Sequence, residues 1–162
     1  MGELQAYKQG KNTNVAGSAL TITTKKEKVT AAAWHPTKGM VMYPFAYTSD
    51  VWHTIQAIAP KVGVLQAKVR IAGKAKHVLC LTSASAKKSL HILPADKQLK
   101  EAIYTLVWSE KEVVNYVNDV EVSRSKNPLA GEDLHLLMRS YLAANQKGTG
   151  KMDIDWVRVY QN

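Results

Sequence analysis

The sequence predicts an all-β sandwich, and three observations lead to this fold class. Short runs of β-branched and aromatic residues recur along the chain, separated by clusters of Gly, Asn, Pro and Lys. The run "VLQAKVRIA" (64–72) alternates apolar and polar residues with the two-residue period of a half-buried strand. No segment has the length and periodicity of a convincing long helix. About eleven short strands without helices are typical of two sheets packed face to face.

The predicted strands follow one another closely along the chain. Asn118 and Asp119 stand between two of them, where a tight hairpin turn needs the positive φ that these residues tolerate. The segment "DLHLLMRSYL" also fits a helical stripe, but its neighbours favour a strand. In chain order, the expected strands are 19–24, 30–34, 49–55, 63–72, 77–83, 89–93, 102–109, 112–118, 120–124, 133–142 and 151–161.

Length, charge and cysteine count limit the class of protein. At 162 residues the chain has the length of one domain, and no repeat or Pro-rich linker divides it. Lys and Arg number 22 against 13 Asp and Glu, which gives a formal charge of +9. This excess favours polyanions or acidic surfaces, although a solvated basic exterior is its commoner origin. The single Cys80 excludes an internal disulfide and is expected to be a small buried side chain.

The sequence given shows neither a membrane span nor a signal peptide. No run approaches the roughly 18 apolar residues of a spanning helix, and the amino terminus lacks the apolar core of a signal. In the start "MGELQAYKQG", the family-like sequence begins almost at the first residue. Met1-Gly2 is interpreted as residues added when the domain was cut from a longer precursor. Residues 1–162 are therefore expected to be a single domain excised from a longer protein.

Several segments resemble the family-16 glycoside hydrolases of the laminarinase and endoglucanase types. The opening "ELQAYKQGKNTNVAGSALTITTKKEK" is similar to the start of that family, and "MDIDWVRVYQ" is very similar to its final strand. Between them, "YTSDVWHT", "VGVLQAKVRIA" and "AIYTLVWSEKEVVNYVNDVEV" match in order and spacing. The resemblance spans nearly the whole chain. It implies a concanavalin A-like jelly roll of two curved antiparallel sheets, the concave one forming a glycan-binding cleft.

The same resemblance indicates where the chemistry of the family would lie. Retaining enzymes of this type use two carboxylates about 5–5.5 Å apart, and the family carries them on one strand, as Glu-x-Asp-x-Glu or with one extra residue. That strand aligns with "KSLHILP" (88–94). Ser89 replaces the nucleophile, His91 the middle Asp, and Leu93 or Pro94 the acid/base. The resemblance therefore implies a family scaffold that lacks its catalytic carboxylates.

Two neighbouring positions depart from the family as well. The preceding family strand carries a cleft-lining Trp, but here it reads Val78-Leu79-Cys80-Leu81. Asn115 occupies a position that is often aromatic.

A new catalytic centre formed by Ser89 and His91 on the same strand has less support than a polar cleft wall or a solvent-facing strand. Ser89 and His91 would lie about 6–7 Å apart on one face, which is too far for direct activation of the hydroxyl. Asp96 and Glu101 follow in the loop "PADKQLKE", where solvated charges are the simpler interpretation. A divergent hydrolase with a relocated acid pair stays an alternative.

Binding without cleavage needs aromatic faces and a few polar groups on a preformed concave surface. Trp108 and Trp156 lie in strongly apolar strands and are expected in the core. Trp52 beside His53 is the better surface candidate. The candidate substrate-binding residues, if their strands point them into the cleft, are Trp34, Trp52, His53, Lys68, Arg70, His77, His91 and Tyr141.

Basic residues bear on the kind of ligand. If Lys74, Lys76, Lys87 and Lys88 gather at one rim of the cleft, an acidic polysaccharide carrying uronate or sulfate is favoured over a neutral glucan. Nucleic acid is the runner-up for the same charge, but no recognition helix, zinc spacing or aromatic RNA-binding motif accompanies it.

The resemblance also implies a structural Ca²⁺, held by Asp155 and a backbone carbonyl of Gly17 or Ser18. A surface Asp without a metal is the alternative, and no other cofactor is implied.

Together, these observations predict a non-catalytic carbohydrate-binding, pseudo-glycosidase module that binds a polysaccharide or oligosaccharide in its concave cleft. The family implies an exported bacterial system, at the cell surface, in the periplasm or secreted. The alternatives are a divergent glycoside hydrolase or lyase, and a structural or interaction domain whose cleft is filled. The sequence leaves the oligomeric state open.

Overall fold

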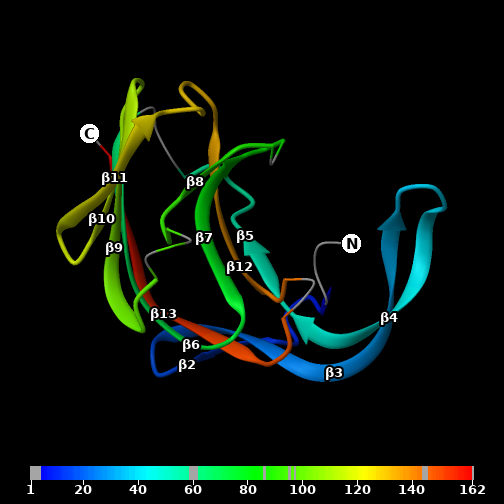
Figure 1. Ribbon diagram of the computed structural model, residues 1–162. Coiled ribbons are helices and arrows are strands. Elements are labelled where there is room, and N and C mark those ends of the chain that lie inside the picture. Colours follow the sequence, from blue (N-terminus) through cyan, green and yellow to red (C-terminus); the bar gives the residue numbers. More distant parts are fainter. Residues whose placement is uncertain are drawn as a thin grey trace.

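The computed structural model describes residues 5–58, 62–85, 87–94, 96, 98–143 and 146–161, whose regular structure is β-strand throughout (Figure 1). None of these residues belongs to a helix that could cross a membrane. The strands are β1 (Gln5–Tyr7), β2 (Thr13–Ala16), β3 (Ala19–His35), β4 (Gly39–Ser49), β5 (Val51–His53), β6 (Gly63–Gly73), β7 (Lys76–Ser83), β8 (Ser89–His91), β9 (Glu101–Trp108), β10 (Glu112–Val117), β11 (Val120–Lys126), β12 (Leu134–Tyr141) and β13 (Gly150–Gln161).

The strands form two sheets that pack face to face, which confirms the predicted all-β sandwich (Figure 1). The large sheet has the order β1-β4-β3-β13-β6-β9-β10-β11, with β2 added beside β3. The small sheet has the order β5-β12-β7-β8. The pairing of β1 with β4 is parallel, whereas the other strand pairs are antiparallel.

The core lies between β6 and β9 of the large sheet and β7 and β12 of the small sheet. In β6 the predicted alternation is confirmed, because Leu65, Ala67 and Val69 are fully buried and the residues between them are not. Trp108 and Cys80 are also buried, as expected. The expectation for Trp156 is wrong: it is half-buried and paired with Lys68 on the outer side of the large sheet, where the guanidinium carbon of Arg158 lies 4.6 Å from its ring centroid.

The segment 133–142 forms strand β12 rather than a helix, which confirms the sequence interpretation. Alternate residues of β12 pack against the core, as a strand requires and a helix would not.

A long hairpin, formed by Val29–His35 of β3 and Gly39–Phe45 of β4, projects from the sandwich (Figure 1). We call it the arm. In the described part of the chain, these two segments pair only with each other. The sequence prediction missed β4 and divided β3 at 25–29. Pro44 lies inside β4, and a β-bulge between Lys26 and Val29 lets β3 continue through the charged run.

Two predicted strands are shorter than expected. The segment 49–55 is divided by Asp50, a fully buried residue whose carboxylate accepts hydrogen bonds from Thr13 Oγ1 at 2.7 Å and Val51 N at 3.1 Å. Strand β8 ends at His91 because the amides of Ile92 and Leu93 both donate to the carbonyl of Leu79.

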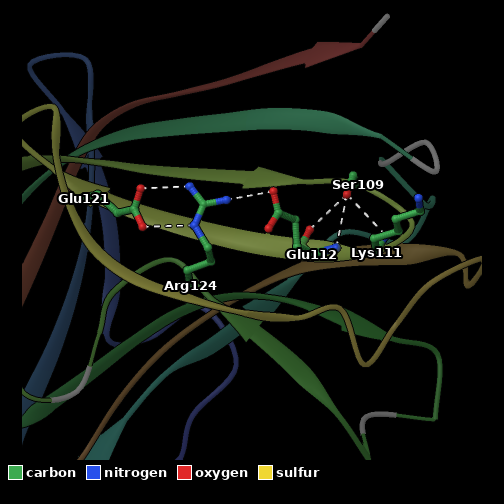
Figure 2. Close-up of polar contacts among 5 residues, drawn as sticks. All are labelled: Ser109, Lys111, Glu112, Glu121 and Arg124. Carbon is green, nitrogen blue, oxygen red and sulfur yellow. Dashed lines mark hydrogen bonds and ion pairs between the residues drawn. The ribbon is translucent and has the colours of Figure 1, made fainter.

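The β10–β11 hairpin turns at Asn118 and Asp119, whose φ values of 47° and 65° confirm the predicted turn. Figure 2 shows the ion pairs of Arg124 on β11: its Nη1 lies 2.8 Å from Glu112 Oε1 of β10, and its Nη2 lies 2.9 Å from Glu121 Oε2 of the same strand. At the β9–β10 turn, Ser109 Oγ accepts the amides of Lys111 and Glu112.

Candidate functional site

The candidate site lies on the face of the small sheet that is turned away from the core. Leu79 and Leu81 of β7 point into the core, so Cys80 between them and Thr82 after them point to the opposite face. We call this opposite face the open face. The arm stands on the same side of the small sheet (Figure 1).

Strand register aligns the open-face side chains in two rows. The first row runs His53, Leu137, Cys80 and His91, because each is paired with the next across neighbouring strands. The second row runs His135, Thr82 and Ser89. With strands about 4.8 Å apart, the first row spans about 14 Å. Three histidines therefore share one face, although they come from three different strands.

Ser89 and His91 point to the open face, as the predicted alternation requires, while Leu90 is in the core. Their surroundings favour the uncharged forms of the Cys80 thiol and the His91 imidazole, because both pKa values shift in that direction. Burial raises the pKa of the Cys80 thiol, an effect that a hydrogen bond from Ser89 partly offsets. Burial and the positive charge of Arg139 lower the pKa of His91. Leu93 is buried at 1% exposure, so this alternative for the missing acid/base does not reach the open face.

Arg139 extends the open face beyond the histidine rows. Its guanidinium carbon lies 5.0 Å from the ring centroid of Tyr141, and its Nη1 donates to Tyr7 Oη at 3.4 Å. Gln5 connects the same region to the end of β12, because its Oε1 accepts the amide of Leu142 at 2.8 Å. An arginine and two tyrosines are therefore gathered at one end of the face.

The four strands of the small sheet contain no Asp or Glu. Within these strands, the open face therefore offers none of the carboxylate pair on which retaining glycoside hydrolysis depends. Its polar groups are imidazoles, hydroxyls and a guanidinium, which bind by hydrogen bonding and charge.

A polar crevice of about 350 Å³ lies beside β8, the edge strand of the small sheet, where β10 and β11 of the large sheet come close. Its lining includes Ser89, His91, Asp96, Asn115 and Ser123. Asn115 Nδ2 donates to Ser123 Oγ at 3.1 Å, but Asn115 Oδ1 is buried without a hydrogen-bond partner among the described residues. A buried acceptor without a donor is costly, so this oxygen would be satisfied by a ligand or water that donates.

A larger groove of about 960 Å³ runs along the arm. Tyr43, Phe45 and Tyr47 line it on one side of β4, together with Lys26 and Lys147. The rings of Tyr43 and Phe45 are 6.4 Å apart and tilted by 47°. Sequence reasoning missed these residues, although aromatic side chains at 43, 45 and 47 have the two-residue period of one strand face.

The structure brings together only part of the predicted binding set. His53, His91 and Tyr141 lie on the open face. Trp52 points to the other face of β5, where its Nε1 donates to Thr13 Oγ1 at 2.8 Å and its side chain is 44% exposed. Trp34 lies at the end of the arm, 67% exposed and opposite Met40.

Lys68, Arg70 and His77 do not reach the open face. Lys68 and Arg70 alternate with core residues of β6 and therefore lie on the outer side of the large sheet. His77 is 4% exposed, and its Nδ1 is 2.8 Å from Ser140 Oγ. The reason is the same in each case: strand parity fixes the side, and a sequence pattern does not reveal which side carries the cleft.

The four lysines that would mark an acidic ligand do not form one rim. Lys74 and Lys76 lie where β7 begins, whereas Lys87 and Lys88 lie beyond its end. The eight residues of β7 separate the two pairs by about 20 Å or more.

The surroundings of Asp155 contain few ligands for the Ca²⁺ ion that the resemblance implies. Its Oδ2 lies 3.3 Å from Lys68 Nζ. Among the described residues, no group of three His, Cys, Asp or Glu side chains is placed to hold a metal ion. Ca²⁺ takes six to eight oxygen ligands, so the surroundings of Asp155 do not fit it well. The hypothesis stays a prediction.

The fold is that of the family-16 glycoside hydrolases in solved structures. A κ-carrageenase from Pseudoalteromonas carrageenovora, solved with an oligotetrasaccharide of κ-carrageenan, is similar with a TM-score of 0.73 and 14% identity over 99% of this chain and 86% of that chain. The laminarinase catalytic domain of Thermotoga maritima MSB8 gives a TM-score of 0.72 and 17% identity over 99% and 84%. A non-specific endo-β-1,3(4)-glucanase from family GH16 gives 0.73 and 19% over 98% and 78%. No protein-family model matches the sequence, and no curated protein matches it.

These likenesses confirm the predicted concanavalin A-like jelly roll of the family-16 type. At such low identity they establish the fold, and the chemistry has to be argued from the side chains of this chain.

Proposed function

We propose that this protein is a non-catalytic carbohydrate-binding module that holds a polysaccharide on its open face. The observation that carries the proposal is the composition of that face. It lies on a family-16-like sheet but displays histidines, hydroxyls, tyrosines and an arginine on strands without Asp or Glu. Export from a bacterial cell, which the family resemblance implies, is part of the same proposal.

Each type of group on the face has a role in holding a sugar. The aromatic groove of the arm offers the rings of Tyr43 and Phe45 for stacking against a pyranose. The guanidinium of Arg139 lies over one face of the Tyr141 ring, which leaves the other face of Tyr141 for a sugar. Imidazole and hydroxyl groups exchange hydrogen bonds with sugar hydroxyls. Asn115 Oδ1 needs a donor, and a sugar hydroxyl in the crevice would supply one.

Affinity gel electrophoresis in laminarin, mixed-linkage β-glucan and κ-carrageenan tests binding. We expect retardation in at least one gel, and Tyr141→Ala should weaken the affinity about twofold to tenfold, as loss of an aromatic contact does. Trp34→Ala is the matched control, because Trp34 lies on the outer side of the arm and its loss should leave retardation unchanged. Absence of retardation in every gel would refute binding and favour a structural role.

The preference for an acidic polysaccharide now rests on the net charge of +9 and on Arg139 rather than on a lysine rim. If it is right, retardation in κ-carrageenan exceeds that in laminarin at low salt and falls steeply as salt is added. Equal retardation of the protein in both gels would contradict it.

One observation favours the enzymatic alternative: Asp96 lines the same crevice as Ser89 and His91. A reducing-sugar assay on the same polysaccharides decides between the two. We expect no release of reducing ends. Release that Asp96→Asn abolishes would show that a relocated carboxylate works there, and the non-catalytic proposal would be wrong.

A further inference from the structure

We propose that the outer side of the arm binds the surface of a bilayer that contains anionic phospholipids. Three cross-strand pairs form this side: Thr30 with Pro44, Ala32 with Met42, and Trp34 with Met40. We call these six residues the outer stripe. All six are exposed, none carries a charge, and the three largest side chains are each more than half exposed. A contiguous apolar patch of this kind marks a contact surface.

The fold turns the outer stripe away from the groove of the arm. The half-buried residues that alternate with those of the stripe include Tyr43 and Phe45, which line the groove on the inner side. Because successive side chains of a strand point to opposite sides, the stripe faces outward. The arm projects from the sandwich, so the stripe lies at the periphery of the molecule, where a flat surface can reach it (Figure 1).

Lysines stand at both ends of the outer stripe. Lys38 belongs to the turn that joins the two strands of the arm. Lys28 lines a hollow at the base of the arm together with Thr30 and Pro44. Between residues 28 and 49 the sequence contains no Asp or Glu. An apolar stripe with a cation at each end matches an anionic membrane surface, in which lipid phosphates lie just above the acyl chains.

Charge distinguishes a lipid surface from other occupants of the stripe. The preceding carboxylate, Glu27, is paired with Lys8, and the whole chain has a net charge of +9. A second copy would bring the same lysines and no acid to neutralise them. A protein partner would form directional hydrogen bonds, but the strong hydrogen-bonding groups among the side chains of the stripe are only the Thr30 hydroxyl and the Trp34 N–H. Anionic lipid supplies negative charge and needs no such groups.

The backbone of the arm limits how deeply it enters the lipid. Among the described residues, the two segments of the arm pair only with each other, so their outer edges keep unpaired N–H and C=O groups. Such groups are costly in the hydrocarbon core but are hydrated among the headgroups. The arm therefore lies along the membrane surface, with Trp34 at the level where indole rings accumulate. The open face takes no part, so this proposal does not depend on glycan binding.

Flotation of the full chain with vesicles tests the attachment. One set of vesicles contains equal parts of phosphatidylcholine and phosphatidylglycerol, and the other contains phosphatidylcholine alone. We expect the protein to float with the anionic vesicles at low salt and to be released as salt is added, with little binding to the neutral ones. Failure to float with the anionic vesicles would overturn the proposal.

An apolar substitution locates the contact on the stripe. Trp34→Ala should lower the affinity for anionic vesicles about tenfold, because a large apolar side chain no longer leaves water on binding. Val120→Ala is the matched control, since Val120 is 65% exposed on a different hairpin, and its loss should leave the affinity unchanged. Equal affinities of the two variants would place the contact elsewhere.

A charge substitution tests the two ends of the stripe. The double variant Lys28→Ser/Lys38→Ser should bind anionic vesicles several times more weakly than Lys100→Ser/Lys111→Ser, which removes the same charge from exposed positions outside the arm. If both double variants lose the same affinity, net charge alone attracts the protein and the outer stripe is not the contact.

Fluorescence reports the contact in the unaltered protein. Phosphatidylglycerol brominated on its acyl chains should quench the parent strongly and Trp34→Phe much less, because the phenyl ring keeps the arm on the membrane but does not report. Equal quenching would mean that a different tryptophan contacts the lipid. Sedimentation without vesicles examines the second copy: a dimer that Met40→Ser/Met42→Ser dissociates would show that another chain covers the stripe, and the proposal would be wrong.

Discussion

His77 shows how far the surroundings of a side chain can depart from what its residue type suggests. It was a candidate for ligand binding, but it lies in the interior beside Ser140. Burial lowers its pKa from 6.5 to about 4, although a hydrogen bond with the backbone of Ala72 acts in the opposite direction. The residue is therefore a neutral structural group at physiological pH.

This shift gives a pH dependence with a definite sign. The unfolded chain takes up the His77 proton near pH 6.5, whereas the folded protein takes it up only near pH 4, so acid favours unfolding between these values. The contribution is complete above pH 6.5 and is lost as pH falls, with a slope of up to about 1.4 kcal/mol per pH unit. Urea unfolding of the parent and of His77→Gln from pH 7 to 4 measures it. Equal slopes for the two proteins would show that His77 does not titrate as described.

Gly73 is a second residue whose surroundings determine the effect of a substitution on stability. Its φ is +86°, and a Cβ there would lie 2.3 Å from the carbonyl oxygen of Thr149. We expect Gly73→Ala to lower the free energy of unfolding by about 3 kcal/mol or more, because backbone strain and a backbone clash combine.

Gly10→Ala is the matched control for Gly73→Ala. Gly10 has a similar φ of +73° but no atom within 4 Å of the built Cβ, so its loss should cost about 1–2 kcal/mol. Urea unfolding that gives equal losses for both variants would contradict the steric explanation.

The sequence predicted single residues well where alternation alone decides their side. Ser89 and His91 share a face, and Trp108 is in the core, as expected. It could not exclude Lys68 and Arg70 from the cleft, because the alternation of β6 separates a polar from an apolar face but does not reveal which face, or which sheet, carries the cleft. Nor could it find the environment of Cys80, which depends on pairing with His91 across β7 and β8.

The arm is the strand pair least supported by the rest of the molecule. Its inner side carries half-buried aromatic residues, while Trp34, Met40 and Met42 on the outer side are 67%, 63% and 64% exposed. An isolated two-stranded hairpin is marginally stable in water. The sequence missed β4 because both sides of the arm are apolar, so the polar-apolar period that identified β6 is absent there.

Native-state hydrogen exchange should therefore show weak protection in the arm and strong protection in the central strands. Amides of the arm between Val29 and His35 are expected to open at about 1–2 kcal/mol, whereas those of β6, paired on both sides with β13 and β9, should open only near the global free energy of unfolding. Protection in the arm equal to that in β6 would mean that the arm is held by contacts beyond its own hairpin.

Arg124 of β11 pairs with Glu112 of β10 and with Glu121 of its own strand, and we expect these exposed ion pairs to contribute little to stability despite their good geometry (Figure 2). The Arg124 side chain is 48% exposed, and its charge lowers the pKa of Glu121 mainly through their hydrogen bonds. Arg124→Ala should leave stability nearly unchanged in thermal or urea unfolding, because solvent screens exposed pairs. A loss as large as that expected for Gly73→Ala would indicate that the network orders the whole hairpin.

Considered as one body, the protein has the jelly-roll fold of family-16 glycoside hydrolases in solved structures, and the strands of its smaller sheet carry no Asp or Glu. The fold was predictable because strand period, hairpin turns and family-like segments agree along the chain. The site was predictable only in part. The strand carrying Ser89 and His91 was located, but the arm groove and the row that aligns His53 with His91 depend on how distant strands meet.

The central claim is that this chain binds a polysaccharide and leaves it intact. Size-exclusion chromatography with light scattering, applied to the protein mixed with laminarin and with κ-carrageenan, measures both parts at once. We expect protein to co-elute with at least one polymer whose molar mass is unchanged after prolonged incubation. A polymer that becomes shorter, or protein that elutes alone from every mixture, would contradict the account.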